Sequence, residues 1–318
     1  MSGPWASVVD GVAGRHGGSK GREAMARRFG SAAAFKASLE AHLRKLAGGR
    51  KTPLSTLQLK FVIERLLARL FHAPDPPWLL KGGFAMDLRF RPQARTTKDV
   101  DLSIALASEF LPVDFSGGFR DRIQGAVDVD LGDYLTYRIG APRQELTNAP
   151  RGGARDPCEA VLVGKTYAKF HIDVGCGDAV VGEPERILGD DLLWFAGIPP
   201  AAVLAISKPQ QFAEKVHAYT FPWSGRLNTR TKDLVDLVLL IERGLPDVAR
   251  IRSALRATFS ARGTHPLPAS LDPPPGAWAV DFPAMATEAG LTTGDLLGAF
   301  SILESFWATG SLGGEAGE

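Results

Sequence analysis

Two aspartates stand two positions apart in RTTKDVDLS (95–103), where the apolar residues predict a strand over 100–106. Successive side chains of a strand point to opposite faces, so Asp99 and Asp101 project from the same face with their carboxylates close together. Two like charges that close are costly without water, and protonation or a cation relieves the cost. A hard divalent ion such as Mg²⁺ or Mn²⁺ accepts one or two carboxylates and completes its shell with water and substrate phosphates. The pair therefore predicts a metal site for phosphate chemistry.

A pair of glycines precedes these aspartates in LKGGFAMDLR (80–89). The surrounding residues predict a short strand over 78–80 and a helix over 84–90. Because they lack Cβ, Gly82 and Gly83 let the backbone approach a phosphate chain, and the helix behind them offers free N–H groups and the positive end of its dipole. Two glycines are usually just a turn, and a D-x-D is often surface acid. The order of strand, glycines, helix and acidic strand is more specific than either part.

A third acid lies in FHIDVGCGD (170–178), where Asp173 interrupts a run of strand-forming residues. An acid in a buried sheet needs a partner. If this strand neighbours the one with Asp99 and Asp101, three carboxylates converge, an arrangement that suits metal ions clamping the oxygens of an in-line displacement at phosphorus. His171 shares the face of Asp173, and for such a histidine packing, or support of a neighbouring ligand, is a more common role than ligation.

The C-terminal third adds basic and acidic residues on predicted helices, in PQQFAEKVHAYTF (209–221) and RLNTRTKDLVDLVLLIERG (226–244). The second helix is apolar nearly all round and is therefore expected to be buried. Asp233 and Asp236 lie on one side of it and require a basic partner, for which Lys215, Arg230 and Lys232 are the candidates. These cations could hold a triphosphate against the glycines. The alternative is that Asp233 is only a first-turn acid favoured by the helix dipole.

Taken together, LKGGFAMDLRF, RTTKDVDL, FHIDVGCGD, FAEKVHAY and NTRTKDLVDL resemble the AbiEii/AbiGii toxin family of nucleotidyltransferases, a branch of the DNA polymerase β-like superfamily. The resemblance runs from about Leu54 to about Gly244. It implies that nucleotide and metal are carried by Gly82, Gly83, Asp99 and Asp101, that Lys215 contacts the triphosphate and that Asp233 supports it. Arg230 stands where the family tends to be basic, and Asp173 occupies the third acidic strand. Pro209 departs from the family, many of whose members have an acid near that position.

The resemblance also implies a function. Members of the family commonly act as toxins with a cognate antitoxin, and some transfer nucleotides to the acceptor end of tRNA. We therefore expect an NTP-dependent transferase that joins a nucleotide to an acceptor hydroxyl, on RNA at the tRNA 3′ end, with release of pyrophosphate. Three alternatives remain open: a catalytically silent binding protein of the same fold, a transferase acting on a protein or small-molecule hydroxyl, and a metal-dependent phosphohydrolase.

Charge and composition limit the environment of the protein. The net charge is +2, yet residues 1–70 carry 13 Lys and Arg against 4 Asp and Glu. This surplus fits an anionic partner such as RNA, although Arg44, Lys45, Arg50 and Lys51 also suit the solvated faces of helices. Cys158 and Cys176 are the two cysteines, which favours buried thiols over disulfides or zinc. The apolar runs are too short to span a membrane, so we expect a cytoplasmic protein without a membrane partner.

The order of predicted elements indicates an α+β fold with a polymerase β-like mixed sheet. Helices are predicted over 22–47 and 54–72, strands over 134–140 and 160–175, and helices over 209–221, 230–243, 247–259 and 293–308. We expect a loose leader at 1–20, a nucleotidyltransferase lobe with its N-terminal helices at 21–200, and a mostly helical lobe at 201–318.

Overall fold

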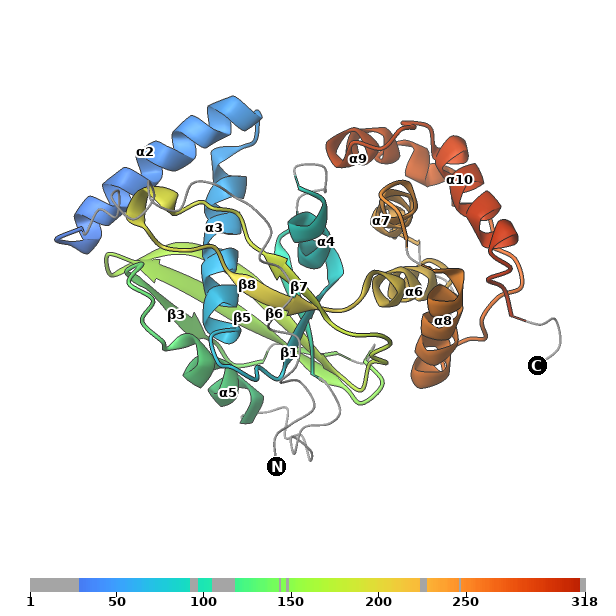
Figure 1. Ribbon diagram of the computed structural model, residues 1–318, viewed down its shortest axis with the longest axis horizontal. Coiled ribbons are helices and arrows are strands. Elements are labelled where there is room, and N and C mark those ends of the chain that lie inside the picture. The colour runs from blue at the N-terminus through green and yellow to red at the C-terminus, as the bar shows by residue number, and fades with distance from the viewer. Residues whose placement is uncertain are drawn as a thin grey trace.

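The computed structural model of the protein describes residues 29–91, 97–104, 118–142, 144–146, 149–223, 228–245 and 247–314. A twisted mixed sheet with helices on one face forms one side of the molecule, and a group of helices forms the other (Figure 1). The predicted α+β architecture is confirmed. No helix among the described residues is long and apolar enough to cross a bilayer.

The described sheet has eight strands in the order β3-β5-β6-β2-β1-β8-β7, with β4 paired to β5. Strands β2 and β6 run parallel, as do β1 and β8, and the other pairs are antiparallel. The strands are β1 (Trp78–Lys81), β2 (Asp99–Ile104), β3 (Leu135–Ile139), β4 (Gln144–Glu145), β5 (Gly153–Leu162), β6 (Lys165–Cys176), β7 (Glu185–Leu188) and β8 (Ala202–Ala205).

Three helices belong to the covered face of the sheet: α2 (Ala32–Arg50), α3 (Leu54–Leu70) and α5 (Gly118–Val127). Figure 1 shows α3 crossing the strands with α2 outside it. The predicted helix over 22–47 begins later, because Ser31 is an N-cap whose hydroxyl accepts a hydrogen bond from the Ala34 N–H at 3.2 Å. Residues 22–28 lie outside the described residues.

Two predictions about strands were incomplete. The stretch 160–175 is not continuous, because the chain reverses at Val163 and Gly164, whose φ angles are 56° and 67°. Positive φ at both central residues is the geometry of a two-residue hairpin turn. Helix α5 and strands β7 and β8 had no clear periodicity in the sequence. Strand β8 lies beyond residue 200 and pairs with β1, so the sheet continues past the boundary predicted for the first lobe.

The C-terminal helices are α6 (Lys208–Tyr219), α7 (Thr231–Glu242), α8 (Val248–Arg262), α9 (Phe282–Ala289) and α10 (Leu296–Thr309), with 3₁₀ turns η2 (Trp194–Ala196) and η3 (Gly276–Ala279). Four were predicted within a few residues, and α9 was missed. Pro209 falls in the first turn of α6 behind the N-cap Ser207. A proline costs no helical hydrogen bond there, which explains how the chain tolerates it.

The buried apolar side chains form two clusters. One lies between the sheet and α2, α3 and α5, and the other lies among α6 to α10. Helix α4 (Gly82–Phe90) contributes to both, since Phe84 packs in the first while Met86 and Phe90 pack in the second. The helix that follows the two glycines is thus fixed from both sides, which sets the position of the glycines.

A buried ion cluster ties α3 to the start of β3. Asp133 is fully buried and accepts hydrogen bonds from Arg69 at 2.6 and 2.9 Å and from Arg65 at 2.7 Å. Burial raises the pKa of Asp133, but the bonds from Arg69 and the charge of Arg65 outweigh burial and hold it below its usual value. The carboxylate therefore stays charged and neutralises two buried guanidinium groups.

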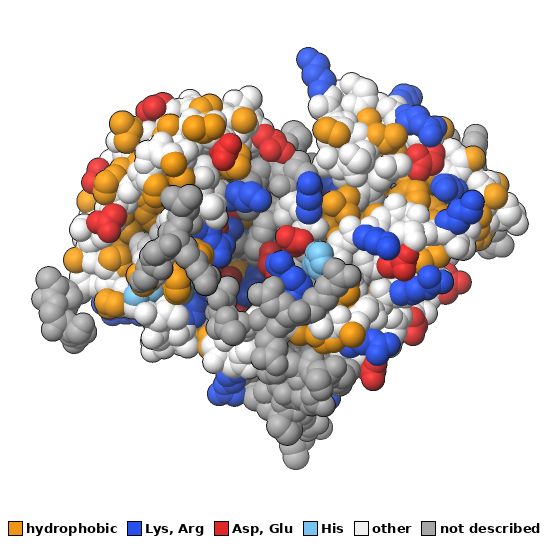
Figure 2. All heavy atoms as spheres, turned by 180° about the vertical axis from the view of Figure 1, so that it is seen from behind, with side chains coloured by type: hydrophobic (Ala, Val, Ile, Leu, Met, Phe, Trp, Pro, Cys, Tyr) orange, Lys and Arg blue, Asp and Glu red, His pale blue; other side chains and the backbone are white. Residues whose placement is uncertain are grey.

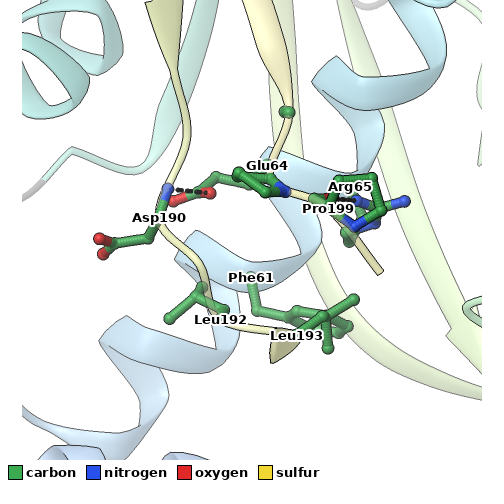
Figure 3. A pocket seen from close by; sticks show the side chains of 9 residues that line it. Phe61, Glu64, Arg65, Asp190, Leu192, Leu193 and Pro199 are labelled. Atoms are coloured by element: carbon green, nitrogen blue, oxygen red, sulfur yellow. Dashed lines mark hydrogen bonds between the residues drawn. The ribbon is translucent and has the colours of Figure 1, made fainter. Parts of the chain in front are cut away.

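Helix α3 also carries a buried acid beside a small pocket that the segment 189–201 closes (Figure 3). One carboxyl oxygen of Glu64 accepts a hydrogen bond from the Asp190 N–H at 2.7 Å, and the other has no hydrogen-bond partner. Burial raises the pKa of Glu64 to about 8. Glu64 is therefore protonated in the folded protein at neutral pH.

Replacement of Asp133 by Asn should destabilise the fold by about 3–5 kcal/mol, because it leaves two buried arginines without their counter-charge. The measurement is urea unfolding followed by circular dichroism. The control is Asp121→Asn, at a carboxylate that is 72% exposed, where a change within about 0.5 kcal/mol is expected. A loss below 1 kcal/mol in the Asp133 variant would contradict the role assigned to the cluster.

Glu64 should make the folded state less stable as pH rises. Its folded pKa of about 8 exceeds the ordinary value of 4.5, so the folded state holds the proton more tightly than the unfolded state and loses this advantage between about pH 4.5 and pH 8. In Glu64→Gln, which cannot titrate, the melting temperature should fall less over this range than in the wild type. The exposed Glu304→Gln serves as control and should follow the wild type. Parallel curves for all three proteins would refute the assignment.

Candidate active site

One row of charged residues crosses four strands on the face of the sheet that α2, α3 and α5 leave uncovered (Figure 1). The register places Arg155 of β5 opposite Asp173 of β6, Asp173 opposite Asp101 of β2, and Asp101 opposite Lys81 of β1. Directly opposed residues of neighbouring strands point to the same face. The two acids therefore lie side by side with a cation at each end of the row, and the predicted adjacency of the strands that bear Asp99, Asp101 and Asp173 is confirmed.

The pKa of the Asp101 carboxyl is raised to about 6. Burial is the largest cause, the charges of Asp173 and Asp99 act in the same direction, and Lys81 and Lys215 act in the opposite direction. The effect of Lys215 on Asp101 means that the helical part of the molecule reaches the acids. A carboxylate among like charges is the situation that a bound cation relieves.

The Asp101 carboxylate leaves no room for a side chain at Gly82. The φ of Gly82 is +65°, a region that favours glycine, and a Cβ placed there would lie 1.9 Å from Oδ2 of Asp101. The absence of a side chain thus lets α4 begin directly against the acidic row. Gly83 is buried as the second residue of that helix, and the N-cap Lys81 makes no side-chain hydrogen bond to the first turn. The glycines lie beside the acids, as the sequence predicted.

Asp99 stands at the solvent end of the same face. Its carboxylate is 46% exposed and lies 4.0 Å from Nδ1 of His171, which is its register partner on β6. His171 is 38% exposed. The imidazole thus lies beside a predicted metal ligand, which agrees with the supporting role that the sequence analysis favoured over ligation.

Asp173 has a partner that the sequence did not reveal. Arg155 donates two hydrogen bonds to it, from Nε at 2.7 Å and from Nη2 at 2.5 Å. These bonds, together with the charges of Asp99 and Asp101, raise the pKa of Arg155 despite the opposing effect of burial. The guanidinium is therefore a partly exposed cation at the edge of the acidic cluster. No short-range pattern in the sequence marks Arg155, because it lies on the part of β5 that was not predicted as a strand.

Lys215 joins α6 to α7. Its ammonium lies 2.8 Å from a carboxylate oxygen of Asp233 and 2.8 Å from one of Asp236. Helix α7 is buried as predicted, and both of its acids have the basic partner that burial requires. Arg230 lies 3.6 Å from Asp233, and its guanidinium is 5.4 Å from the ring centre of Trp223. Lys232, the third candidate, is exposed.

Behind the row lies a buried network that sequence reasoning missed. The Lys81 ammonium is hydrogen-bonded to Asp178 and lies 3.9 Å from Glu214, while Arg262 lies 3.0 Å from Asp178 and 3.9 Å from Glu214. Burial lowers the pKa of Lys81, but Glu214 and Asp178 outweigh it and hold the pKa above its usual value. The network links β1 to α6 and α8 and so positions the helices relative to the acids.

The charged residues of the site lie in a hollow of the molecular surface. Figure 2 shows the molecule hollowed between its two sides, with Lys and Arg side chains along the walls and acids between them. Gln211 of α6 donates a hydrogen bond to the Gly82 carbonyl at 3.3 Å, so α6 covers the β1 end of the row. The end of the row at β5 and β6 stays outside this cover. The site therefore has a closed side at the glycines and an open side at Arg155.

The donor set fits a divalent ion in part. Among the described residues no three His, Cys, Asp or Glu side chains are grouped so as to hold a metal by themselves. Two carboxylates suffice for Mg²⁺ when substrate phosphates complete the shell. Burial, with the neighbouring charge of Asp173, raises the pKa of Asp101, and a bound cation would relieve both effects. Asp99 and Asp101 fit this role. Asp173 is occupied by Arg155, so its role as a third ligand stays a prediction.

A family model described as nucleotidyl transferase AbiEii toxin, type IV toxin–antitoxin system, matches residues 65–298. The chain belongs to this family and is a nucleotidyltransferase. Among solved structures it is similar to MenT4, a nucleotidyltransferase toxin from Mycobacterium tuberculosis H37Rv, with 15% identity, a TM-score of 0.51, and coverage of 86% of this chain and 97% of that one. This likeness confirms the fold.

A second solved structure is an antigenic nucleotidyltransferase-like protein from Paracoccidioides brasiliensis. It shares 16% identity over 65% of this chain and 89% of that one, with a TM-score of 0.36, too low for any structural argument. No curated protein sequence matches the chain.

Replacement of Gly82 by Ala should displace Asp101 or the start of α4 and reduce nucleotide transfer at least about tenfold, since a misplacement near 1 Å at a reacting group is that costly. The control is Gly125→Ala on α5, where an added Cβ meets nothing within 4 Å and helix propensity predicts a small gain in stability. Both variants are assayed for transfer and for thermal unfolding. Wild-type transfer in the Gly82 variant would show that the close approach is not required.

Proposed function

We propose that the protein transfers a nucleotide from an NTP to a hydroxyl of an RNA acceptor, at the 3′ end of tRNA, and releases pyrophosphate. The observation that carries the proposal is the alignment of Asp101 with Asp173 beside the Gly82 backbone, with Lys215 near enough for its charge to lower the pKa of Asp101. A phosphate-accepting backbone, an acidic pair and a cation at one place are the parts that phosphoryl transfer requires.

The closed side of the site suits the NTP. The backbone at Gly82 and Gly83 and the open first turn of α4 would face the phosphates. Lys215 and Arg230 would stabilise the negative charge of the departing pyrophosphate, and Asp233 holds both cations in place. In the proposed step the acceptor oxygen forms a bond to the α-phosphorus, and the bond from this phosphorus to the bridging oxygen breaks. The hydroxyl proton passes to solvent.

Asp99 and Asp101 would hold Mg²⁺ or Mn²⁺, which supplies charge neutralisation at the phosphates when bound. Asp173 lies on the acceptor side of Asp101. Its ion pair with Arg155 would either persist, so that Asp173 orients the guanidinium, or open to release the carboxylate as a third ligand. Asp236, the second partner of Lys215, would keep that ammonium correctly aimed.

The family of toxins to which the chain belongs supports a cognate antitoxin as partner. The site supports a cytoplasmic enzyme supplied with NTP and RNA, and the basic surplus of residues 1–70 agrees with a nucleic-acid acceptor. A single experiment addresses donor and acceptor together: each α-labelled NTP is incubated with purified tRNA and with the protein. Covalent label on tRNA supports the proposal. Label on protein alone would replace RNA as the acceptor, and release of inorganic phosphate would indicate a phosphohydrolase.

Asp99→Asn and Asp101→Asn should each lower transfer at least about a hundredfold, because loss of one electrostatic group at the reacting phosphate costs that much. Lys215→Ala should weaken transfer as well. Asp121→Asn, at an exposed carboxylate, is the matched control and should retain wild-type activity. Transfer at the wild-type rate in both D-x-D variants would refute the assignment of these residues.

A further inference from the structure

The uncovered face of the sheet continues beyond the acidic row across β6, β5 and β3. Two residues from Asp173 along β6, His171 lies opposite Asp99 of β2 and Pro157 of β5. Two residues further along β6, Lys169 lies opposite Glu159 of β5, and Glu159 lies opposite Arg138 of β3. Their alternation with Phe170 and Cys158, which are buried under the helices, places these side chains on the uncovered face. We call this surface, with Arg155, His171, Lys169, Glu159 and Arg138, the platform.

The platform is accessible to solvent. Arg138 is 71% exposed, Arg155 is 36% exposed, and Lys169 is exposed. Strand positions four apart lie about 13 Å from one another and adjacent strands about 4.8 Å apart. Lys169 is four positions from Asp173 on β6, and Arg138 lies two strands away from Lys169. Both cations are therefore on a surface that leads away from the acids, with Arg155 at its inner edge.

The chemistry of the platform favours a phosphate backbone over a protein. Protein interfaces depend on a few large apolar or aromatic anchors. The exposed large hydrophobic side chains in the described part of the chain are Tyr134, Val163, Val180, Leu188, Trp194, Val280 and Leu297, and none belongs to β3, β5 or β6. The platform instead offers arginine and lysine, with Glu159 partly neutralised by Arg138 at 3.8 Å and hydrogen-bonded to Thr166. Cations on a surface without apolar anchors match a polyanion.

The position of the platform relative to the site assigns its role. Helices α6 and α7 and the glycines occupy the β1 side of the acids, where the NTP is proposed to bind, so a second substrate must approach from the β6 and β5 side. We infer that the single-stranded 3′ end of an RNA acceptor lies along the platform, with backbone phosphates against Arg155, Lys169 and Arg138. This inference rests on the proposed function and adds to it the surface that binds the acceptor.

The ion pair of Arg155 with Asp173 acquires a function in this arrangement. A strand of phosphates that approaches three carboxylates is repelled by them, and the guanidinium at the boundary offsets this repulsion. Arg155 would thus hold the last phosphate of the acceptor near Asp173, so that the terminal hydroxyl reaches the α-phosphorus. Lys169 and Arg138 act further out and take no part in the chemical step.

The test uses the full-length double variant Arg138→Gln/Lys169→Gln and bulk tRNA. Binding is measured by fluorescence anisotropy at several salt concentrations, together with KM and kcat for transfer. Loss of two phosphate contacts should lower the slope of log K against log salt by about 1.4, at about 0.7 per contact for a single strand. The KM for tRNA should rise with kcat unchanged.

The matched control is Arg250→Gln/Arg256→Gln, which removes the same charge from exposed positions of α8 in the helical part. It should behave as wild type. Equal losses in both double variants would reveal only a general effect of net charge, and wild-type binding in the platform variant would refute the platform. Wild-type protein that does not bind tRNA also overturns the inference. If the wild type binds tRNA through the platform yet transfers no nucleotide, the proposed function fails and the surface stands.

Discussion

The repulsion between Asp101 and Asp173 governs the arrangement of this molecule. The parallel register of β2 and β6 sets these two acids directly opposite one another, and the fold surrounds them with positive charge from Lys81, Arg155 and Lys215. Lys81 and Lys215 are themselves held by further acids, whereas Arg155 is paired with Asp173 itself. The site still retains an acid, Asp101, whose pKa is raised. A bound cation would stabilise the charged form of this carboxylate.

The same constraint links the two sides of the molecule. Lys81 connects the first strand to Asp178, Glu214 and Arg262, and Lys215 is held between Asp233 and Asp236. Because burying an unpaired charge is costly, the Lys81 network adds to the apolar packing that positions α6 and α8 relative to the sheet, and the Lys215 ion pairs hold α7 to α6. The geometry between Lys215 and the acids is thus a consequence of electrostatics as well as of the helical core. Variation at Asp178 or Arg262 would therefore act on the site without touching a substrate.

The asymmetry of the sheet suits the two substrates of the proposed reaction. Helix α6 closes the end of the row at the glycines, and the other end opens onto strands whose outward residues include Arg155, Lys169 and Arg138. In the proposed function, a donor and an acceptor would approach the acids from opposite ends without competing for the same surface. Arg155 would then lie at the boundary between the two substrates.

Much of the site could be predicted from the sequence because its parts are local. The two-residue spacing of Asp99 and Asp101, the glycines before a short helix, and the apolar character of α7 are all short-range patterns, and the structure brings these segments together in the expected order. The buried partner required by Asp233 and Asp236 was expected for the same reason, since a helix without a polar face cannot leave its acids unpaired. The catalytic and binding roles of these residues are still proposals, because proximity does not measure activity.

Only the tertiary structure decided the contacts between segments that are far apart in the chain. Nothing near Asp173 in the sequence indicates that Arg155 holds it, because their pairing depends on the register of an antiparallel hairpin whose first strand was not predicted. The return of β8 to the sheet, the network around Lys81 and the buried carboxyl of Glu64 likewise arise where distant segments meet. The sequence by itself determined which residues had to avoid water or find a counter-charge. The fold chose the partners, because the energies of pairing and desolvation depend on distance and burial rather than on order along the chain.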